Sequence, residues 1–276
     1  MLSYRHAFHA GNHADLLKHI TLVLALEHLV QKETPLCYID THAGAGRYRL
    51  DSAEAQQTGE ALRGVAQLDE RQAPAVLATW FALLRGVNSG GPQRSYPGSP
   101  LWAASLLRPA DRLRLFELHP QDRQLLQRQF SRDRRVDVRD QDGFEGLKAL
   151  LPPPSRRALV LIDPSYEIKS DYSRIPAIVR DAHRRFATGV YMVWYPLLNR
   201  PEVSRFTTQL ERLRLGPWLR LELRVAGQAG APGMYGSGML VLNPPWKLAG
   251  QMEAVLPWLQ TALGAAGGSW LVRAGD

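Results

Sequence analysis

The chain has 276 residues, and its 34 Lys and Arg against 26 Asp and Glu give a formal net charge of +8. With 45% hydrophobic and 22% charged residues, it is neither a disordered nor a fibrous protein, and its length fits one large α/β domain. No run approaches the roughly 18 apolar residues of a membrane span, and the start lacks the apolar core of a signal peptide, so we expect a cytoplasmic protein. The basic charge suits a polyanionic partner, although charge alone is weak evidence.

The first predicted elements are a helix, a strand and a glycine loop. Residues 13–33 carry apolar side chains at helical spacing and contain no Gly or Pro, which predicts a long helix. After Pro35, the run LCYID predicts a strand that ends at Asp40 and leads into THAGAG. Cys37 is the single cysteine, so it has no internal disulfide partner, and we expect it to pack in this strand.

The rest of the chain alternates strands with helices. Residues 47–96 are polar and helical in pattern, and we interpret them as an inserted helical subdomain of a single domain covering 1–276. Later strands are predicted at LRLFELHP, VDVRDQDG, ALVLIDPSY, GVYMVWYPL, LRLELRVA and GMLVLNPPW, with helices at LWAASLLR, QDRQLLQRQF, GFEGLKALL, EVSRFTTQLERLR and AVLPWLQTAL.

This alternation predicts a mostly parallel sheet covered by helices on both faces, with ligands bound at the carboxyl ends of its strands. The last two predicted strands flank the glycine-rich segment GAPGMYGSG, which favours a hairpin. We therefore expect one antiparallel edge strand.

The strand ends carry the residues suited to binding a nucleotide. In DTHAGAG, the glycines Gly44 and Gly46 would let a ligand approach main-chain amides, although the spacing is not GxGxxG and an ordinary tight turn is the alternative. A carboxylate at Glu117 could accept both hydroxyl protons of a ribose. Glu117 lies much further from the glycine loop than the roughly 20 positions typical of such a unit, so the insertion must lie between Gly46 and Glu117.

The pair Asp142 and Gly143 follows the third strand of this series. The carboxylate could receive an adenine amino group while the glycine leaves room for the ring. The alternative is that Asp142 is the N-cap of the next helix.

The segment Asp163–Tyr166, DPSY, is the most specific of these motifs. Asp163 and the carbonyl of Pro164 can accept both protons of an exocyclic amine and so turn its lone pair toward a methyl donor, while Tyr166 offers a stacking face for the base. The segment Asn243–Trp246, NPPW, has the same type of sequence. We interpret it as a structural turn, because the site belongs at the fourth strand.

Histidines are concentrated near the start of the chain, which raises the question of a metal site. Without a cysteine pair or an HExxH motif we predict no metal, and we expect most of these side chains to contact solvent or phosphate. No GxSxG nucleophile motif is present. The histidines in question are His6, His9, His13, His19 and His28.

The chain carries the motifs DTHAGAG, FELHP, DG and DPSY in this order, the leader SYRHAFHAGNHADLLKH, and the segments YPGSP, RRFATGVY and SGMLVLNPPWKL. In these features it resembles the RlmJ family of bacterial 23S rRNA adenine-N6 methyltransferases. The similarity runs from Met1 to about Leu259. It implies a Rossmann-like class I fold, S-adenosylmethionine as methyl donor, and a monomer acting on protein-free 23S rRNA.

The resemblance also implies site residues. Glu117 would hold the donor's ribose, and Asp142 with Gly143 its adenine. Asp163 takes the catalytic position and Tyr4 that of an aromatic residue near the RNA. Further donor contacts are expected at Lys18, His19, His42 and Ser99.

One residue departs from the family's pattern, since Ser165 stands where DPPY has its second proline. The ring that stiffens the turn is lost, but both acceptors of the amine protons are retained. We therefore predict that activity survives.

Several other functions remain as alternatives. An N6-adenine methyltransferase on DNA, or a protein-amide methyltransferase, could use the same amine-binding turn. A nicotinamide-dependent dehydrogenase would share the sheet but lacks the glycine spacing and leaves DPSY unexplained. A catalytically silent RNA-binding protein would fit the charge and Ser165.

Overall fold

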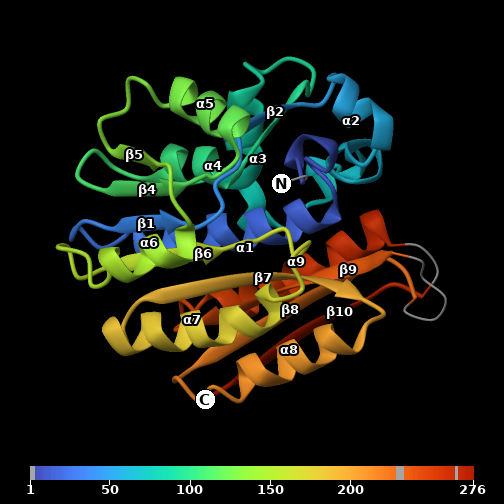
Figure 1. Cartoon of the computed structure of the whole chain (residues 1–276). Coiled ribbons are helices and arrows are strands. Elements are labelled where there is room, and N and C mark those ends of the chain that lie inside the picture. The colour runs from blue at the N-terminus through green and yellow to red at the C-terminus, as the bar shows by residue number, and fades with distance from the viewer. Residues whose placement is uncertain (1–3, 228–232, 265–266) are drawn as a thin grey trace.

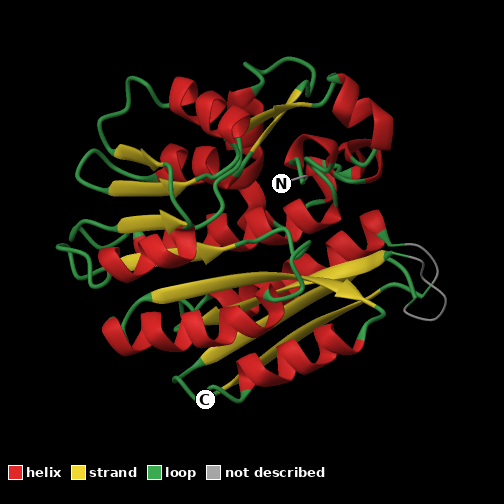
Figure 2. Ribbon diagram, in the orientation of Figure 1, coloured by secondary structure: helices red, strands yellow, loops and turns green. Residues whose placement is uncertain are grey.

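The computed structural model of the chain describes residues 4–227, 233–264 and 267–276. Within these ranges, eight strands form one twisted sheet (Figures 1 and 2). The strands are β1 (Cys37–Asp40), β4 (Arg112–Phe116), β5 (Val136–Arg139), β6 (Ala158–Ile162), β7 (Val190–Leu198), β8 (Trp218–Arg224), β9 (Met234–Leu242) and β10 (Ser269–Gly275).

The strand order is β10-β8-β9-β7-β6-β1-β4-β5. The five strands β7, β6, β1, β4 and β5 are parallel to one another. Strand β9 runs antiparallel to both β7 and β8. A reversed strand inserted at this position of a parallel sheet is the topology of a Rossmann-like class I methyltransferase, which confirms the fold class predicted from the sequence.

The reversed part of the sheet differs in detail from the prediction. The predicted hairpin of β8 and β9 is present, but β9 lies inside the sheet, and the edge is formed by β10, antiparallel to β8. Strand β10 was missed because its sequence, SWLVRAG, has no buried side chain and no clear alternation of polar and apolar residues.

Helices cover both faces of the sheet, as Figure 2 shows. One face packs against α1 (His13–Leu29), α4 (Ser99–Leu106), α5 (Pro120–Gln129) and α9 (Leu248–Leu263). The other packs against α6 (Gly143–Leu150), α7 (Asp171–Arg185) and α8 (Pro201–Glu211).

Helix α7 was not predicted from the sequence. Its polar composition and the internal Pro176 weaken the helical signal. The buried side chains Tyr172, Ile175, Val179 and Ala182 nevertheless recur at intervals of three and four, which is the pattern of an amphipathic helix and would have identified it.

The strand sequences explain why the sheet has two cores. In β6, Leu159 and Leu161 join the core beneath α1 and α9, while Val160 and Ile162 join the core beneath α6 to α8. Successive side chains of a strand point to opposite faces, so a fully apolar strand must be covered on both. Cys37 is buried in β1, as predicted.

The segment between β1 and α4 combines helical turns with a small sheet that the sequence did not predict. Strands β2 (Arg47–Arg49) and β3 (Ser95–Pro97) pair antiparallel. Just beyond this pair, the amide of Gly98 donates to the carbonyl of Gly46 at 2.9 Å. The inserted segment therefore leaves and rejoins the fold at one place, and α4 begins next to the glycine loop. Between the strands lie α2 (Ala53–Thr58), α3 (Ala78–Val87) and four 3-10 turns, Ala61–Arg63, Val65–Gln67, Glu70–Gln72 and Ala75–Leu77.

The leader forms a short 3-10 turn, η1 (His6–Phe8), before α1 begins. Asn12 caps α1 by accepting from the amides of Ala14 and Asp15. None of the helices in the described ranges combines the length and apolar character needed to cross a bilayer.

Candidate active site

A cavity of about 460 Å³ lies at the carboxyl ends of the parallel strands, between the leader and the loops that follow β1, β4 and β6. This is where a sheet of this kind binds ligands. With one exception, the residues singled out from the sequence line it: Tyr4, Lys18, His19, His42, Gly44, Ser99, Glu117, Asp142, Gly143, Asp163, Pro164 and Tyr166. The exception is Gly46, which has a positive φ of 79° and packs beside Leu126, so it shapes the loop without lining the cavity.

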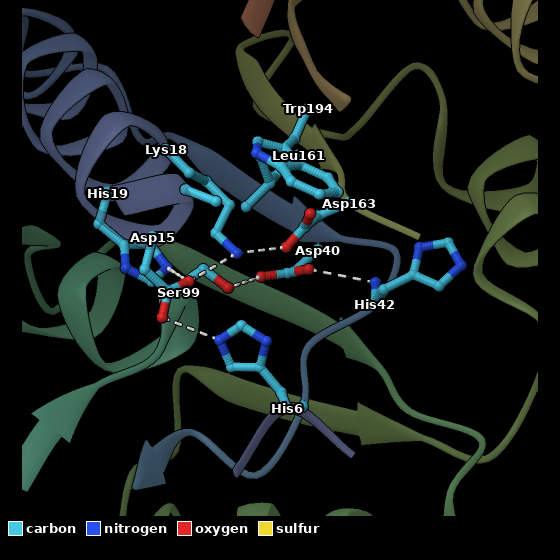
Figure 3. A network of polar contacts seen from close by, with 12 residues as sticks. His6, Asp15, Lys18, His19, Asp40, His42, Ser99, Leu161, Asp163 and Trp194 are labelled. Carbon is cyan, nitrogen blue, oxygen red and sulfur yellow. Dashed lines mark hydrogen bonds and ion pairs between the residues drawn. The ribbon is translucent and has the colours of Figure 1, made fainter. Parts of the chain in front are cut away.

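An ion-pair network lies beneath the cavity (Figure 3). Lys18 Nζ lies 2.6 Å from Asp163 Oδ2 and 3.0 Å from Asp15 Oδ1. Burial lowers the pKa of Lys18, but the two carboxylates outweigh it and raise that pKa above the ordinary range. Burial also raises the pKa of Asp163 to about 6, against the opposing charge of Lys18. Asp163 is therefore ionised at neutral pH, although its pKa lies only slightly below 7.

Asp15 joins the leader to this network and was not singled out from the sequence. Its Oδ2 lies 2.9 Å from His6 Nε2 and accepts from the amide of Gly11 at 2.9 Å. Burial alone would raise the pKa of this carboxyl, yet the neighbouring His6, Lys18 and His19 hold it well below its usual range. The side chain is fully buried, so only the folded structure reveals its partners.

The leader histidines are mostly bound to protein groups. His9 Nδ1 lies 2.9 Å from Glu60 Oε1, and His19 Nδ1 lies 3.0 Å from the Tyr96 hydroxyl. The expected contact with solvent is wrong for His19, which is buried, whereas His6 and His9 remain partly exposed beside their carboxylate partners. In the ranges that the structure describes, no cluster of His, Cys, Asp and Glu has the arrangement of a metal site.

Asp40, at the end of β1, organises the loop beside the cavity. Its buried carboxylate accepts from Tyr38 Oη at 2.6 Å, from Ser99 Oγ at 2.7 Å and from the amide of His42 at 3.2 Å. Burial raises the pKa of Asp40, while these donors oppose the shift. Ser99 therefore reaches the cavity with its hydroxyl already committed to Asp40.

Glu117 holds the other side of the glycine loop. Its Oε2 accepts from the amide of Gly44 at 2.7 Å, and its Oε1 accepts from the amide of His119 at 2.6 Å. Burial raises the pKa of Glu117 to about 7, although both amides counteract it. Gly44 has a φ of 64°, which favours glycine here. Because a carboxylate has about four acceptor positions, each oxygen keeps capacity for a further donor.

Asp142 is a helix N-cap as well as a cavity residue. Its Oδ1 accepts from the amide of Phe144 at 2.7 Å, while its Oδ2 lies 3.5 Å from Arg174. A Cβ on Gly143 would lie 2.1 Å from the carbonyl oxygen of Thr41. The close approach of two strand-end loops therefore requires the glycine, which also lines the cavity.

Two aromatic or cationic side chains at this end of the cavity were not predicted. The ring of Phe144 meets His42 edge-on, with centroids 4.9 Å apart, and Arg174 lies over the Phe144 ring at 5.1 Å. Burial lowers the pKa of His42 to about 4, so its imidazole is neutral at pH 7. Phe144 follows the predicted Gly143 in the chain, whereas Arg174 belongs to α7, the helix that the sequence did not predict.

The DPSY turn is held against β7. Tyr166 has a positive φ of 55°, and its hydroxyl donates to the carbonyl of Trp194 at 2.5 Å. Its ring is largely buried, packing against Tyr172, Trp194 and Phe206. Trp194, half-buried and also lining the cavity, was not predicted from the sequence.

Near the mouth of the cavity, the ring of Tyr4 stacks on His9 with centroids 5.5 Å apart, and its hydroxyl lies 2.8 Å from His6 Nδ1. The NPPW segment lies elsewhere. Asn243 donates to the carbonyls of Ala187 and Gly189 at 2.7 and 2.8 Å, and no residue of NPPW lines the cavity. Its interpretation as a structural turn is confirmed.

Comparison with known proteins identifies close relatives. The family model described as ribosomal RNA large subunit methyltransferase D, RlmJ, matches residues 33–274. The Escherichia coli (strain K12) protein named ribosomal RNA large subunit methyltransferase J is 49% identical over 99% of both chains. The Haemophilus influenzae protein of the same name is 48% identical over 99% of this chain and 98% of its own.

A solved crystal structure has the same fold over nearly its whole length. It is that of a Legionella pneumophila protein, 35% identical in sequence, and it superposes with a TM-score of 0.89 over 97% of this chain and 99% of that one. The structural similarity therefore extends over nearly the whole chain.

Proposed function

The chain belongs to the family described as ribosomal RNA large subunit methyltransferase, RlmJ, and from this premise we propose that it methylates the exocyclic N6 of an adenine in 23S rRNA. S-adenosylmethionine supplies an electrophilic methyl group on a sulfonium centre. The observation that carries the proposal is that the cavity brings Asp163 together with Glu117, Asp142 and the glycine loop.

The donor set fits a nucleoside. The spare acceptor positions of Glu117 suit the two hydroxyls of a ribose. Asp142 Oδ2 would accept from an adenine amino group, and the edge of the ring would lie near His42 and Gly143. In this proposal the methionine portion of the donor would lie in the remaining part of the cavity, which is lined by Lys18, His19 and Ser99.

The amine of the target base would be held by Asp163. In the described residues Oδ2 is paired with Lys18 and Oδ1 has no hydrogen-bond partner, so Oδ1 and the Pro164 carbonyl oxygen are the two acceptors that remain. Accepting both amine protons turns the nitrogen lone pair toward the methyl group. The N–C bond forms as the S–C bond breaks, and the amine proton passes to Asp163 Oδ1 or to water.

Two aromatic residues beside Asp163 would contact the base. Tyr166 offers one face of its ring, although its hydroxyl and much of the ring already fix the turn. Trp194 lies beside it with the indole Nε1 unpartnered in the described structure. Tyr4, bound to His6 and His9 at the rim, would contact the RNA next to the flipped base. Stacking on aromatic side chains is how extruded bases are commonly held.

We further infer that the substrate is 23S rRNA free of ribosomal proteins, and that the protein acts in the cytosol as a monomer. The test offers labelled S-adenosylmethionine with 23S rRNA, duplex DNA or a protein mixture. The proposal requires label in the RNA as N6-methyladenine. Label only in DNA or protein would contradict it, and binding of donor without any transfer would indicate a silent protein.

A cellular experiment complements this assay. Ribosomal RNA from cells lacking the gene should lack one N6-methyladenine, which returns with the wild-type gene but not with Asp163→Ala. Its presence in the deletion strain would contradict the proposal.

A further inference from the structure

The NPPW turn leaves a tryptophan in solvent on the side of the sheet opposite the active site. Trp246 is 77% exposed, more than any other large apolar side chain of the described ranges. The turn beneath it is fixed, since Asn243 has a φ of 52° and its amide group is bonded to two carbonyls. The indole is thus presented outward by an anchored turn, and tryptophan is a residue enriched at binding surfaces.

One cation and one imidazole lie next to this indole. Lys247 Nζ lies 5.0 Å from its ring centroid, and the His28 ring meets it edge-on at 6.3 Å. His28 also lines a cavity of about 330 Å³ together with Lys32, Arg156 and Arg157, so this one side chain links the indole to the cavity. Burial, followed by the charges of Lys247 and Lys32, lowers the pKa of His28.

The charges of this cavity are not balanced locally. Lys32 and Arg156 are exposed and form no ion pair within the described residues. Arg157 is occupied by structure, since it donates to the carbonyl oxygens of Leu29 and Thr34 at the end of α1. The nearby acid Asp111 is paired with Arg108. Glu33, next to Lys32, is also exposed, and its charge acts on Arg108. The cations Lys32 and Arg156 outnumber this acid, so the net charge facing solvent at the cavity is positive.

We propose that Trp246, Lys247, Lys32 and Arg156 form a second RNA contact, in which a single-stranded base stacks on the indole and phosphates lie beside the three cations. The inference rests on the proposed function, because the RNA is the one that also fills the active site. From Lys18 to His28 is ten residues of α1, roughly 15 Å along its axis, a distance that one RNA can bridge.

The chemistry of this surface favours RNA over a protein partner. An exposed aromatic face beside unpaired cations is the usual combination at sites for single-stranded nucleic acid. A protein interface instead centres on an apolar patch depleted of charge, whereas here a single indole lies against Lys247 and next to a cavity lined by Lys32 and Arg156. The NPPW segment, which the catalytic site does not use, thereby acquires a role.

The test compares binding and catalysis with protein-free 23S rRNA. Trp246→Ala should weaken RNA affinity at least about ten-fold. Lys32→Gln with Arg156→Gln should reduce the slope of log affinity against log salt by about 1.4, since each phosphate contact to a single strand contributes about 0.7. Both variants should raise KM and keep kcat at saturating RNA, and S-adenosylmethionine affinity, within about two-fold.

Matched controls lie on other surfaces. Trp270, 42% exposed on β10, is changed to Ala. Arg205 of α8 and Arg212 at its C-cap, both exposed and without an ion pair in the described ranges, are changed to Gln. These should leave RNA affinity and salt slope unchanged, and thermal unfolding verifies that every variant is folded. Unchanged affinity and slope in the Trp246 and Lys32–Arg156 variants would overturn the inference, as would a change of oligomeric state with RNA binding intact. If the wild type methylates RNA while these variants behave normally, only this inference fails; if it methylates none, the proposed function fails.

Discussion

Lys18 Nζ lies 2.6 Å from Asp163 Oδ2, although 145 positions separate the two residues in the chain. The ion pair joins the leader helix α1 to the end of β6 and occupies one oxygen of the carboxylate. Because both side chains lie in the cavity wall, the cation fixes the orientation of Asp163 and directs its second oxygen toward the space where an amine would lie. The leader helix thus lines the same cavity as Asp163 and belongs to the proposed catalytic site.

The first prediction concerns the pH dependence of catalysis. Only ionised Asp163 accepts amine protons, and its pKa is raised to about 6, so kcat should fall as pH decreases through 6 and stay level above it. Lys18 lowers that pKa, so Lys18→Gln should move the acidic limb to higher pH. Single-turnover methylation rates from pH 5 to 8.5 measure both. A limb that stays in place in the variant would contradict the coupling.

A second prediction concerns donor affinity. Burial raises the pKa of Glu117 to about 7, and a ribose binds its ionised form, so the affinity for S-adenosylmethionine should weaken as pH falls below 7. Below the pKa, the dissociation constant should rise about ten-fold per pH unit. Calorimetry on Glu117→Gln provides the control. That variant should bind more weakly, and this pH dependence should be absent; if it persists, another group titrates.

Much of the fold could be predicted from the sequence because fully apolar strands and amphipathic helices leave clear patterns. The run ALVLI, for example, supplies side chains to both cores of the sheet. What could not be predicted depends on tertiary contacts. Strand β10 is stabilised by pairing with β8 in spite of its mixed sequence, and α7 is stabilised by burial of one face in spite of Pro176.

The site was predicted where motif and strand end coincide, as for Asp163 and Glu117. The residues that were missed are those brought in from elsewhere. In the sequence Asp15 is an ordinary helical aspartate, and only the structure shows its contacts with His6 and Lys18. In the sequence Trp194 is indistinguishable from the other residues of its strand. A glycine next to a carboxylate also has two explanations in sequence. Only the structure shows that close packing against Thr41 by itself requires this glycine.

Tyr166→Phe tests whether the hydroxyl fixes the catalytic turn. The change removes the bond to the Trp194 carbonyl and leaves the positive φ of residue 166 without that support. We expect a loss of about 1 kcal/mol in the free energy of unfolding and a lower kcat, with donor affinity unchanged. Denaturant titration and methylation kinetics measure the two effects. An unaltered kcat would show that the ring alone holds the turn.

Gly143→Ala and Gly250→Ala form a matched pair. At Gly143 the new Cβ would meet the Thr41 carbonyl at 2.1 Å, so we expect destabilisation of about 1–3 kcal/mol and weaker donor binding. At Gly250, within α9, a Cβ meets nothing within 4 Å, and the same change should stabilise by about 0.5–1 kcal/mol. Thermal unfolding of both variants checks the signs, and equal effects at the two positions would refute the packing argument.

The most direct measurement is the methylation of 23S rRNA by Asp163→Asn, which keeps the size of the side chain but removes its charge. If the Asp163 carboxylate accepts a hydrogen bond from the amine, kcat should fall about 10²- to 10⁴-fold while the affinity for S-adenosylmethionine changes less than about three-fold. A variant that methylates N6 of adenine at the wild-type rate would contradict the account.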